Sequence, residues 1–377
     1  MRLITPNRAI SSIALAALAV STGTLRADNS YVQTNLVSDV SGTAARTDSR
    51  IVNAWGIDYG PGGPWWVNTN GTGLSIVLDA KGNPYPAATP IVVTVPPPPG
   101  QQGPSKPTSV VFNSTSDFKL DATNKSVFLF ATEDGTISGW NSTVNGGAPV
   151  VKINNSGNAI YKGAAIGQIS GKSALYAANF HQNRVEVYDA SFNPITTLRA
   201  TAFRDAQIPS GFAPFNVQSI AGDILVAYAK QDQDAEDDVA GDGLGYVDVF
   251  TTQGVLVLRL QHGKWMNAPW GFALAPGNFG RLSGRLLVGQ FGSGQIAAFS
   301  TRTGAFEGFM RGPHGKVVQI DGLWGLKFGD GGVAGPRNVL YFAAGINDEK
   351  HGLFGAITST NPHGGYDEID TTGVDDH

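Results

Sequence analysis

Pro269-Trp270-Gly271 is one of six short anchors that recur along the 377-residue chain, each opening an apolar strand. The other five are Ala54-Trp55-Gly56, Pro107-Thr108-Ser109, Tyr161-Lys162-Gly163, Pro214-Phe215-Asn216 and Leu323-Trp324-Gly325. The middle residues of successive anchors lie 53 to 55 positions apart. A repeat of about 50 residues that holds four strands is typical of β-propellers. We therefore expect an all-β fold, a six-bladed β-propeller of four-stranded blades.

Short runs rich in β-branched and aromatic residues follow each anchor and are bounded by turn residues, as strands are. Second strands are expected at 64–67, 127–131, 174–177, 224–228, 286–288 and 339–342. Third strands are expected at 74–78, 136–140, 184–188, 245–250, 295–299 and 353–357. Fourth strands are expected at 91–95, 150–153, 195–198 and 255–260, with a weaker one near Phe306.

The sixth anchor is followed by only three such runs before a polar tail. The run 31–37 has no place in the first blade, so we expect it to form the outer strand of the last one. That arrangement closes the ring and covers an open sheet edge. The predicted boundaries are a signal peptide at 1–27, the propeller at 28–360 and a polar tail at 361–377.

The N-terminus has the pattern of an export signal. Arg2 and Arg8 precede a short apolar run at 10–20, and a cleavage site fits near Ala27. The run is too short to span a bilayer, and the rest of the chain offers no membrane span. We expect a secreted protein, periplasmic or extracellular.

Composition excludes several classes of site. The chain has no cysteine, which excludes disulfides, thiolate metal sites and cysteine nucleophiles. Its formal charge is −4 without a basic cluster, which argues against a nucleic-acid partner. No G-x-S-x-G motif is present, so a nucleophile-elbow hydrolase is also excluded.

Propeller geometry predicts one functional face. Loops that enter an innermost strand open on the same face as loops joining second and third strands, and both classes carry most of the polar residues here. Candidate metal ligands on this face are Asn53, Glu133, Asn267, Asp321 and Asp348. Candidate ligand-binding residues are Trp55, Tyr161, Lys162, His181, Asn216, Trp270 and Trp324. Candidate catalytic residues are Lys230, Glu349 and His351.

Two segments stand out within this set. Residues 347–352 place two carboxylates, an amide and an imidazole together, which suits acid–base chemistry or a divalent metal, or forms a polar turn. The acidic loop from Asp232 to Asp242 could hold Ca²⁺ or form a solvated lid over the channel; EF-hand spacing fails there. Lys230, at its root, suits an anionic group or a neighbouring carboxylate.

The three tryptophans of the anchors also have two interpretations. Their spacing predicts packing between blades, and aromatic rings at a channel mouth can also stack on sugars.

The segments 130–140, 267–271, 320–326 and 345–355 resemble a family of secreted bacterial proteins described as conserved hypothetical, some with a PEP-CTERM sorting tail. The resemblance spans essentially the whole mature chain and implies a propeller and export, without an activity. The chain departs from the tailed members because no hydrophobic anchor follows Asn361.

Two functions remain open from the sequence. The first is binding of a small molecule, a glycan or a surface partner at the channel mouth, with a divalent cation such as Ca²⁺ as a possible cofactor. The second is a metal-assisted hydrolase of a lactone, ester or phosphate, with His351 as the base. The oligomeric state is not predicted.

Overall fold

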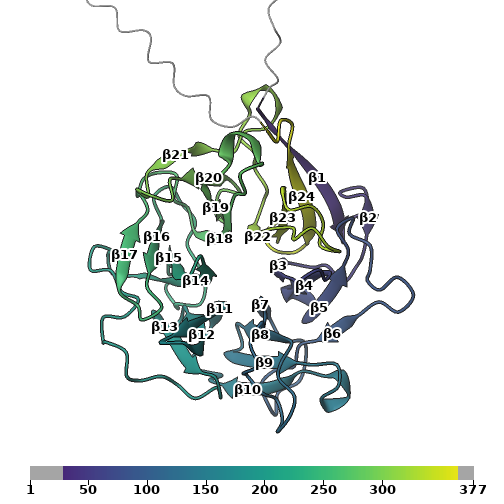
Figure 1. The fold of residues 1–377 in the computed structure, drawn as a ribbon, viewed down its shortest axis with the longest axis vertical. Helices are drawn as coiled ribbons and strands as arrows, with labels where there is room; N and C mark the ends of the chain where they lie inside the picture. The colour runs from purple at the N-terminus through teal and green to yellow at the C-terminus, as the bar shows by residue number, and fades with distance from the viewer. Residues whose placement is uncertain (1–28, 364–377) are drawn as a thin grey trace, which may run out of the picture.

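The computed structural model describes residues 29–363, and within that range six antiparallel sheets stand around a central axis (Figure 1). The colour of the ribbon runs once around the ring, so each sheet follows its predecessor in sequence. The predicted six-bladed β-propeller is confirmed. The predicted signal peptide and all but the first three residues of the tail lie outside the described residues.

Each blade begins with its innermost strand and meanders outward. Blade 1 is β3 (Ala54–Asp58), β4 (Trp65–Thr69), β5 (Leu74–Leu78) and β6 (Val92–Thr94). Blade 2 is β7 (Pro107–Phe112), β8 (Phe128–Thr132), β9 (Thr136–Trp140) and β10 (Val150–Asn154). Blade 3 is β11 (Tyr161–Ile169), β12 (Lys172–Asn179) and β13 (Arg184–Asp189).

The second half of the ring repeats the pattern. Blade 4 is β14 (Phe212–Ile220), β15 (Asp223–Lys230), β16 (Gly245–Phe250) and β17 (Leu256–Arg259). Blade 5 is β18 (Pro269–Leu274), β19 (Leu286–Gln290), β20 (Ile296–Phe299) and β21 (Phe306–Phe309). Blade 6 is β22 (Leu323–Phe328), β23 (Val339–Ala344) and β24 (Leu353–Ser359), completed by β1 (Tyr31–Ser38) and β2 (Arg46–Thr47).

The ring closes as predicted. β1 pairs antiparallel with β24 along its whole length, from Tyr31 opposite Ser359 to Ser38 opposite Leu353. Tyr31 also reaches across to blade 5, where its hydroxyl donates to Phe279 O at 2.8 Å. The head of the described chain therefore completes the last blade and ties it to its neighbour.

The predicted fourth strand of blade 3 is wrong. Ile195 donates a backbone hydrogen bond to Val187 O, but no strand forms at 195–198 in the described chain. Ile195 and Leu198 instead pack against the hydrophobic cluster between blades 3 and 4, where Phe203 is fully buried. The apolar residues that indicated a strand serve this packing instead of a fourth strand.

Every blade carries a β-bulge at its anchor. The pairing with the second strand shifts between Ala54 and Ile57 in blade 1, and an equivalent shift occurs in the other five. A bulge inserts an extra residue and redirects a side chain. Here it brings the middle residues of the anchors toward the axis of the ring.

The innermost strands approach one another very closely. A Cβ at Gly56 would lie 2.6 Å from Thr108 O, and one at Gly325 would lie 2.7 Å from Trp55 O. No side chain fits at such distances, so glycine is required after the anchor tryptophans. This explains why Trp-Gly recurs in the anchors.

The rest of the core lies between adjacent blades, as separate hydrophobic clusters rather than one continuous core. Among residues 29–363, no helix is long and apolar enough to cross a membrane.

Candidate functional site

The anchor side chains meet on the axis and fill the channel. Trp55 stacks on Trp324 with ring centroids 3.7 Å apart, and Trp270 meets both rings edge-on. Phe291 stacks on the other side of Trp324 at 3.8 Å. We call this cluster the axial plug; it comprises Trp55, Phe180, Phe215, Trp270, Phe291 and Trp324. The anchor tryptophans therefore pack across the axis, which divides the channel into two separate mouths.

Lys162 is the one charged residue among the six anchor centres. Its side chain is 2% exposed, and its Nζ lies 2.5 Å from Glu133 Oε1 and 2.6 Å from Asp237 Oδ1. The ammonium also lies 5.4 Å from the centroid of the Trp55 ring. Burial alone would lower the pKa of Lys162, but the two carboxylates outweigh it and raise that pKa above its ordinary value. The lysine is thus a fixed positive charge on the plug.

A hydrogen-bonded network spreads from this ion pair across the mouth. Asn70 Nδ2 donates to Glu133 Oε2 at 2.8 Å, and Asn53 Nδ2 donates to Glu349 Oε1 at 3.0 Å. Asn53 also accepts from Trp324 Nε1 at 3.2 Å, which joins the network to the plug. Blades 1, 2, 3, 4 and 6 therefore each contribute a side chain to the same mouth.

Two carboxyl groups at this mouth are short of positive partners. The pKa of Asp238 is raised to about 7, chiefly by burial; Lys162 opposes this rise, and the nearby Glu349 and Asp237 add to it. Asp238 Oδ2 is buried and has no hydrogen-bond partner among the described residues. Burial likewise raises the pKa of Glu349, against the hydrogen bond from Asn53. The mouth therefore holds more negative charge than Lys162 neutralises.

The loop that carries Glu349 is strained. Asn347, Asp348 and Glu349 have φ of 57°, 52° and 61°, three successive left-handed residues without a glycine. Such conformations cost roughly 1–3 kcal/mol each and concentrate at functional sites. Asp321 Oδ2 helps to hold the loop, since it accepts from Asn347 N at 2.6 Å. The strained backbone holds the Glu349 side chain at the mouth, within hydrogen-bond distance of Asn53.

A cavity of about 330 Å³ opens beside the ion pair of Lys162. Its charged lining consists of four acidic residues, Glu133, Asp134, Glu236 and Asp237, against Lys106 and His181. Burial raises the pKa of Asp134, although the backbone N–H of Lys106 donates to it at 2.7 Å. We call this space the acidic cavity.

Several predicted residues lie on this face but outside the network. His181 Nδ1 is 3.2 Å from Ala235 O in the acidic loop and lines the acidic cavity. Lys230 Nζ lies over the ring of Phe212, 5.4 Å from its centroid. His351 Nδ1 is 2.7 Å from Asp39 Oδ2. His351 follows Glu349 closely, so it lies at the same end of the channel as Glu133, but it is held by Asp39.

The candidate metal ligands are only partly brought together. Asn53 and Glu133 share the network, whereas Asn267 Oδ1 accepts from Gly241 N at 2.7 Å. Asp348 is exposed, and its Oδ2 lies 3.4 Å from Lys350 Nζ. Within residues 29–363, no group of three or more His, Asp or Glu side chains is arranged to hold a metal ion. The metal-assisted hydrolase stays a prediction from the sequence.

Two predicted ligand-binding residues point elsewhere. The Tyr161 hydroxyl donates to Glu186 Oε2 at 2.6 Å within the interface between blades 2 and 3, away from the mouth. Burial raises the pKa of this phenol far above its usual range. Asn216 Nδ2 donates to Trp270 O at 2.7 Å, and Asn216 lines a cavity below the plug. Sequence reasoning missed Asn70, Asp237 and Asp238 as individual site residues, although all three stand in loops assigned to this face.

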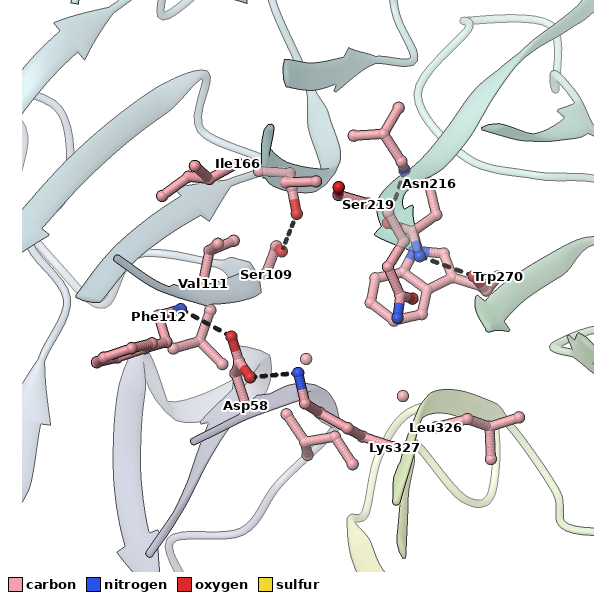
Figure 2. A pocket seen from close by; sticks show the side chains of 18 of the residues that line it. Asp58, Ser109, Val111, Phe112, Ile166, Asn216, Ser219, Trp270, Leu326 and Lys327 are labelled. Atoms are coloured by element: carbon pink, nitrogen blue, oxygen red, sulfur yellow. Dashed lines mark hydrogen bonds and ion pairs between the residues drawn. The ribbon is translucent and has the colours of Figure 1, made fainter. Parts of the chain in front are cut away.

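The opposite mouth is a smaller cavity of about 210 Å³ (Figure 2). Lys327 Nζ lies 2.6 Å from Asp58 Oδ1 in its wall, and Asp58 Oδ2 accepts from Phe112 N at 2.7 Å. Figure 2 shows Ser109 and Ser219 across from this ion pair. Because the two charges are paired with each other, this mouth has no excess of either sign.

Comparison with family models finds no match for the chain. Two uncharacterized proteins of Acanthamoeba polyphaga mimivirus are 29% and 28% identical over 350 and 353 residues. Each alignment covers 89% of this chain, and 82% and 87% of the respective viral proteins. These relatives are viral rather than bacterial, and none of the comparisons supports a PEP-CTERM tail.

Solved structures show similarity at the level of the fold. A protein of unknown function from Bacteroides thetaiotaomicron has a TM-score of 0.53 at 11% identity, covering 87% of this chain and 76% of its own. An auxiliary nutrient binding protein from the same organism scores 0.52 at 12% identity, covering 88% and 77%. A glucose dehydrogenase scores 0.51 at 10% identity, covering 86% and 98%. The chain is therefore similar to β-propeller proteins of unknown or varied function.

Proposed function

We propose that this propeller binds a small organic cation, such as an amine or a guanidinium compound, in the acidic cavity beside Lys162. The observation that carries the proposal is the excess of carboxylates there. Four acidic residues line the cavity against one lysine and one histidine. A bound positive charge would balance this excess, as complementary charges do at binding sites.

The position of Lys162 supports the same class of ligand. Its ammonium lies among carboxylates and 6.0 Å from the centroid of the Phe180 ring, in addition to Trp55. Carboxylates with aromatic faces nearby are the surroundings in which proteins hold organic cations. The chain thus already places one ammonium group, that of Lys162, on the plug. Glu133 and Asp237, which contact this ammonium, also line the acidic cavity and would face a bound organic cation there.

Asp238 directly follows Asp237 of the cavity lining, so its carboxylate, when ionised, adds to the negative potential beside the bound cation. The opposite mouth offers no comparable excess of charge.

The test is thermal unfolding with agmatine, spermidine, glycerol and calcium chloride as separate additives. Agmatine or spermidine should raise Tm, since saturation at about 100 times Kd stabilises by about 2.7 kcal/mol. Glu133→Gln should abolish the rise. Asp223→Asn, at the start of β15 on the opposite face, is the matched control and should retain it. A rise with calcium alone, or none with either cation, would overturn the proposal.

We further propose that the protein acts outside the cytoplasm after cleavage near Ala27. N-terminal sequencing of the protein recovered from the periplasm or the medium tests this directly. A chain that retains residues 1–27 and stays in the cytoplasm would contradict it.

A further inference from the structure

Blade 3 differs from the other five blades because, within the described chain, it has only three strands. Its outer strand β13 is therefore a sheet edge. Proteins usually pair or cover such edges, since open backbone groups recruit another strand. Figure 1 shows β13 at the rim of the ring, on the far side from blade 6.

Part of the β13 edge remains open. Val187 O accepts from Ile195 N at 2.7 Å, and Asp189 N donates to Asn193 O at 2.8 Å. Since outward-facing residues alternate along an antiparallel strand, Val185 also presents its N–H and C=O outward. No backbone hydrogen bond from this outward side of Val185 occurs among the described residues.

A groove of about 660 Å³ runs between this edge, β10 and the loop after β13. Its charged lining is basic: Lys152, Arg184, Arg199 and Arg204, with Glu186 as the one acidic residue. The Glu186 carboxylate is already engaged, since it accepts from the hydroxyls of Tyr161 and Tyr188. Arg199 and Arg204 are exposed, and no side-chain hydrogen bond or ion pair of either occurs among the described residues. The groove therefore suits an acidic strand.

The chain itself contains such a segment. Residues 364–377, outside the described range, carry Asp367, Glu368, Asp370, Asp375 and Asp376 and no lysine or arginine. The stretch 369–372 is Ile-Asp-Thr-Thr, in which three residues are β-branched and favour strands.

We propose that residues 364–377 of a second copy add a short strand to β13 and complete blade 3. Backbone groups of the added strand would pair with Val185, while the flanking carboxylates meet Arg199 and Arg204. Blade 6, from which the segment leaves, stands opposite blade 3. A segment of the same copy would have to cross a face of the ring, whereas one from a neighbour reaches the rim directly.

This contact joins different surfaces of the two copies, so it predicts open, concentration-dependent association. Sedimentation velocity of the full mature chain over a concentration series should show a rising weight-average sedimentation coefficient, reduced by high salt. Arg199→Glu with Arg204→Glu should weaken association at least about tenfold. Lys172→Glu with Arg302→Glu makes the same charge change outside the groove and should leave the association unaltered.

Two further experiments test whether residues 364–377 are the segment that binds the edge of β13. An excess of a synthetic peptide of residues 364–377 should dissociate the assemblies, and Val185→Pro, which removes the open N–H, should prevent them. A monomer at every concentration would overturn the proposal. So would association that persists in the double arginine variant, or that neither the peptide nor Val185→Pro affects.

Discussion

Asp238→Asn should make the protein more stable at neutral and alkaline pH, against the usual effect of changing a buried residue. Burial raises the pKa of Asp238 from 3.8 to about 7. The folded protein therefore holds this proton more tightly than the unfolded chain does. Stability must then fall as the pH rises from about 4 to about 7, and it stays at the lower level above that.

The magnitude follows from the same values. Each pH unit between the folded and unfolded pKa corresponds to about 1.4 kcal/mol, so ionisation of Asp238 costs the folded state roughly 4 kcal/mol. Asparagine has nearly the same shape and cannot ionise. The variant should thus match the parent near pH 4 and exceed it by roughly 4 kcal/mol near pH 8.

Equilibrium unfolding in urea, followed by tryptophan fluorescence at several pH values, measures this difference. Asp234→Asn, an exposed carboxylate of the same loop, is the control and should show no pH-dependent gain. A variant that is less stable than the parent at pH 8, or a difference that does not change with pH, would refute the reasoning. The organic-cation proposal adds that Asp238→Asn should also weaken agmatine binding.

Two other changes test the axis of the ring. Lys162→Met should destabilise the protein by roughly 3–5 kcal/mol in urea unfolding, because it leaves Glu133 without its buried ammonium partner; a loss below about 1 kcal/mol would contradict the buried ion pair. Gly325→Ala should lower Tm, since its Cβ would meet Trp55 O at 2.7 Å, by the equivalent of roughly 1–3 kcal/mol. Gly277→Ala, where a Cβ meets nothing within 4 Å, should leave Tm unaltered, and equal effects at the two glycines would disprove the close approach.

The sequence predicts the ring well because the physical cause of the repeat is local. A bulge at each anchor and a closely approaching neighbour demand the same small motif in several blades, so the motif recurs at nearly equal spacing. The third strands at Leu74–Leu78, Thr136–Trp140 and Gly245–Phe250 have the predicted bounds. The closing strand ends one residue later than expected, at Ser38.

The site is less predictable because neighbouring residues in a strand face different surroundings. The sequence predicts the same role for Tyr161 and Lys162, because both stand at the start of an innermost strand. The bulge between Tyr161 and Gly163, however, places only the lysine at the mouth. Asp237 and Asp238 lie in a long loop, and spacing alone does not determine where such a loop crosses the mouth. Asp237 reaches the mouth through its contact with Lys162, 75 positions away in the sequence.

The pairing of β1 with β24 has a consequence for the order of assembly. Ser30 and Thr360 are hydrogen-bonded although they are 330 positions apart. β1 is the first described strand to be synthesised, and it cannot pair until β24, the last one, has been made. Blades 1 to 5 can form their own sheets as they emerge, but blade 6 cannot. Since contacts between distant segments slow folding, we expect the pairing of β1 with β24 to limit the rate at which the propeller closes. It also brings both ends of the described chain together, so a circularly permuted chain that joins them and opens between two other blades should fold without this wait.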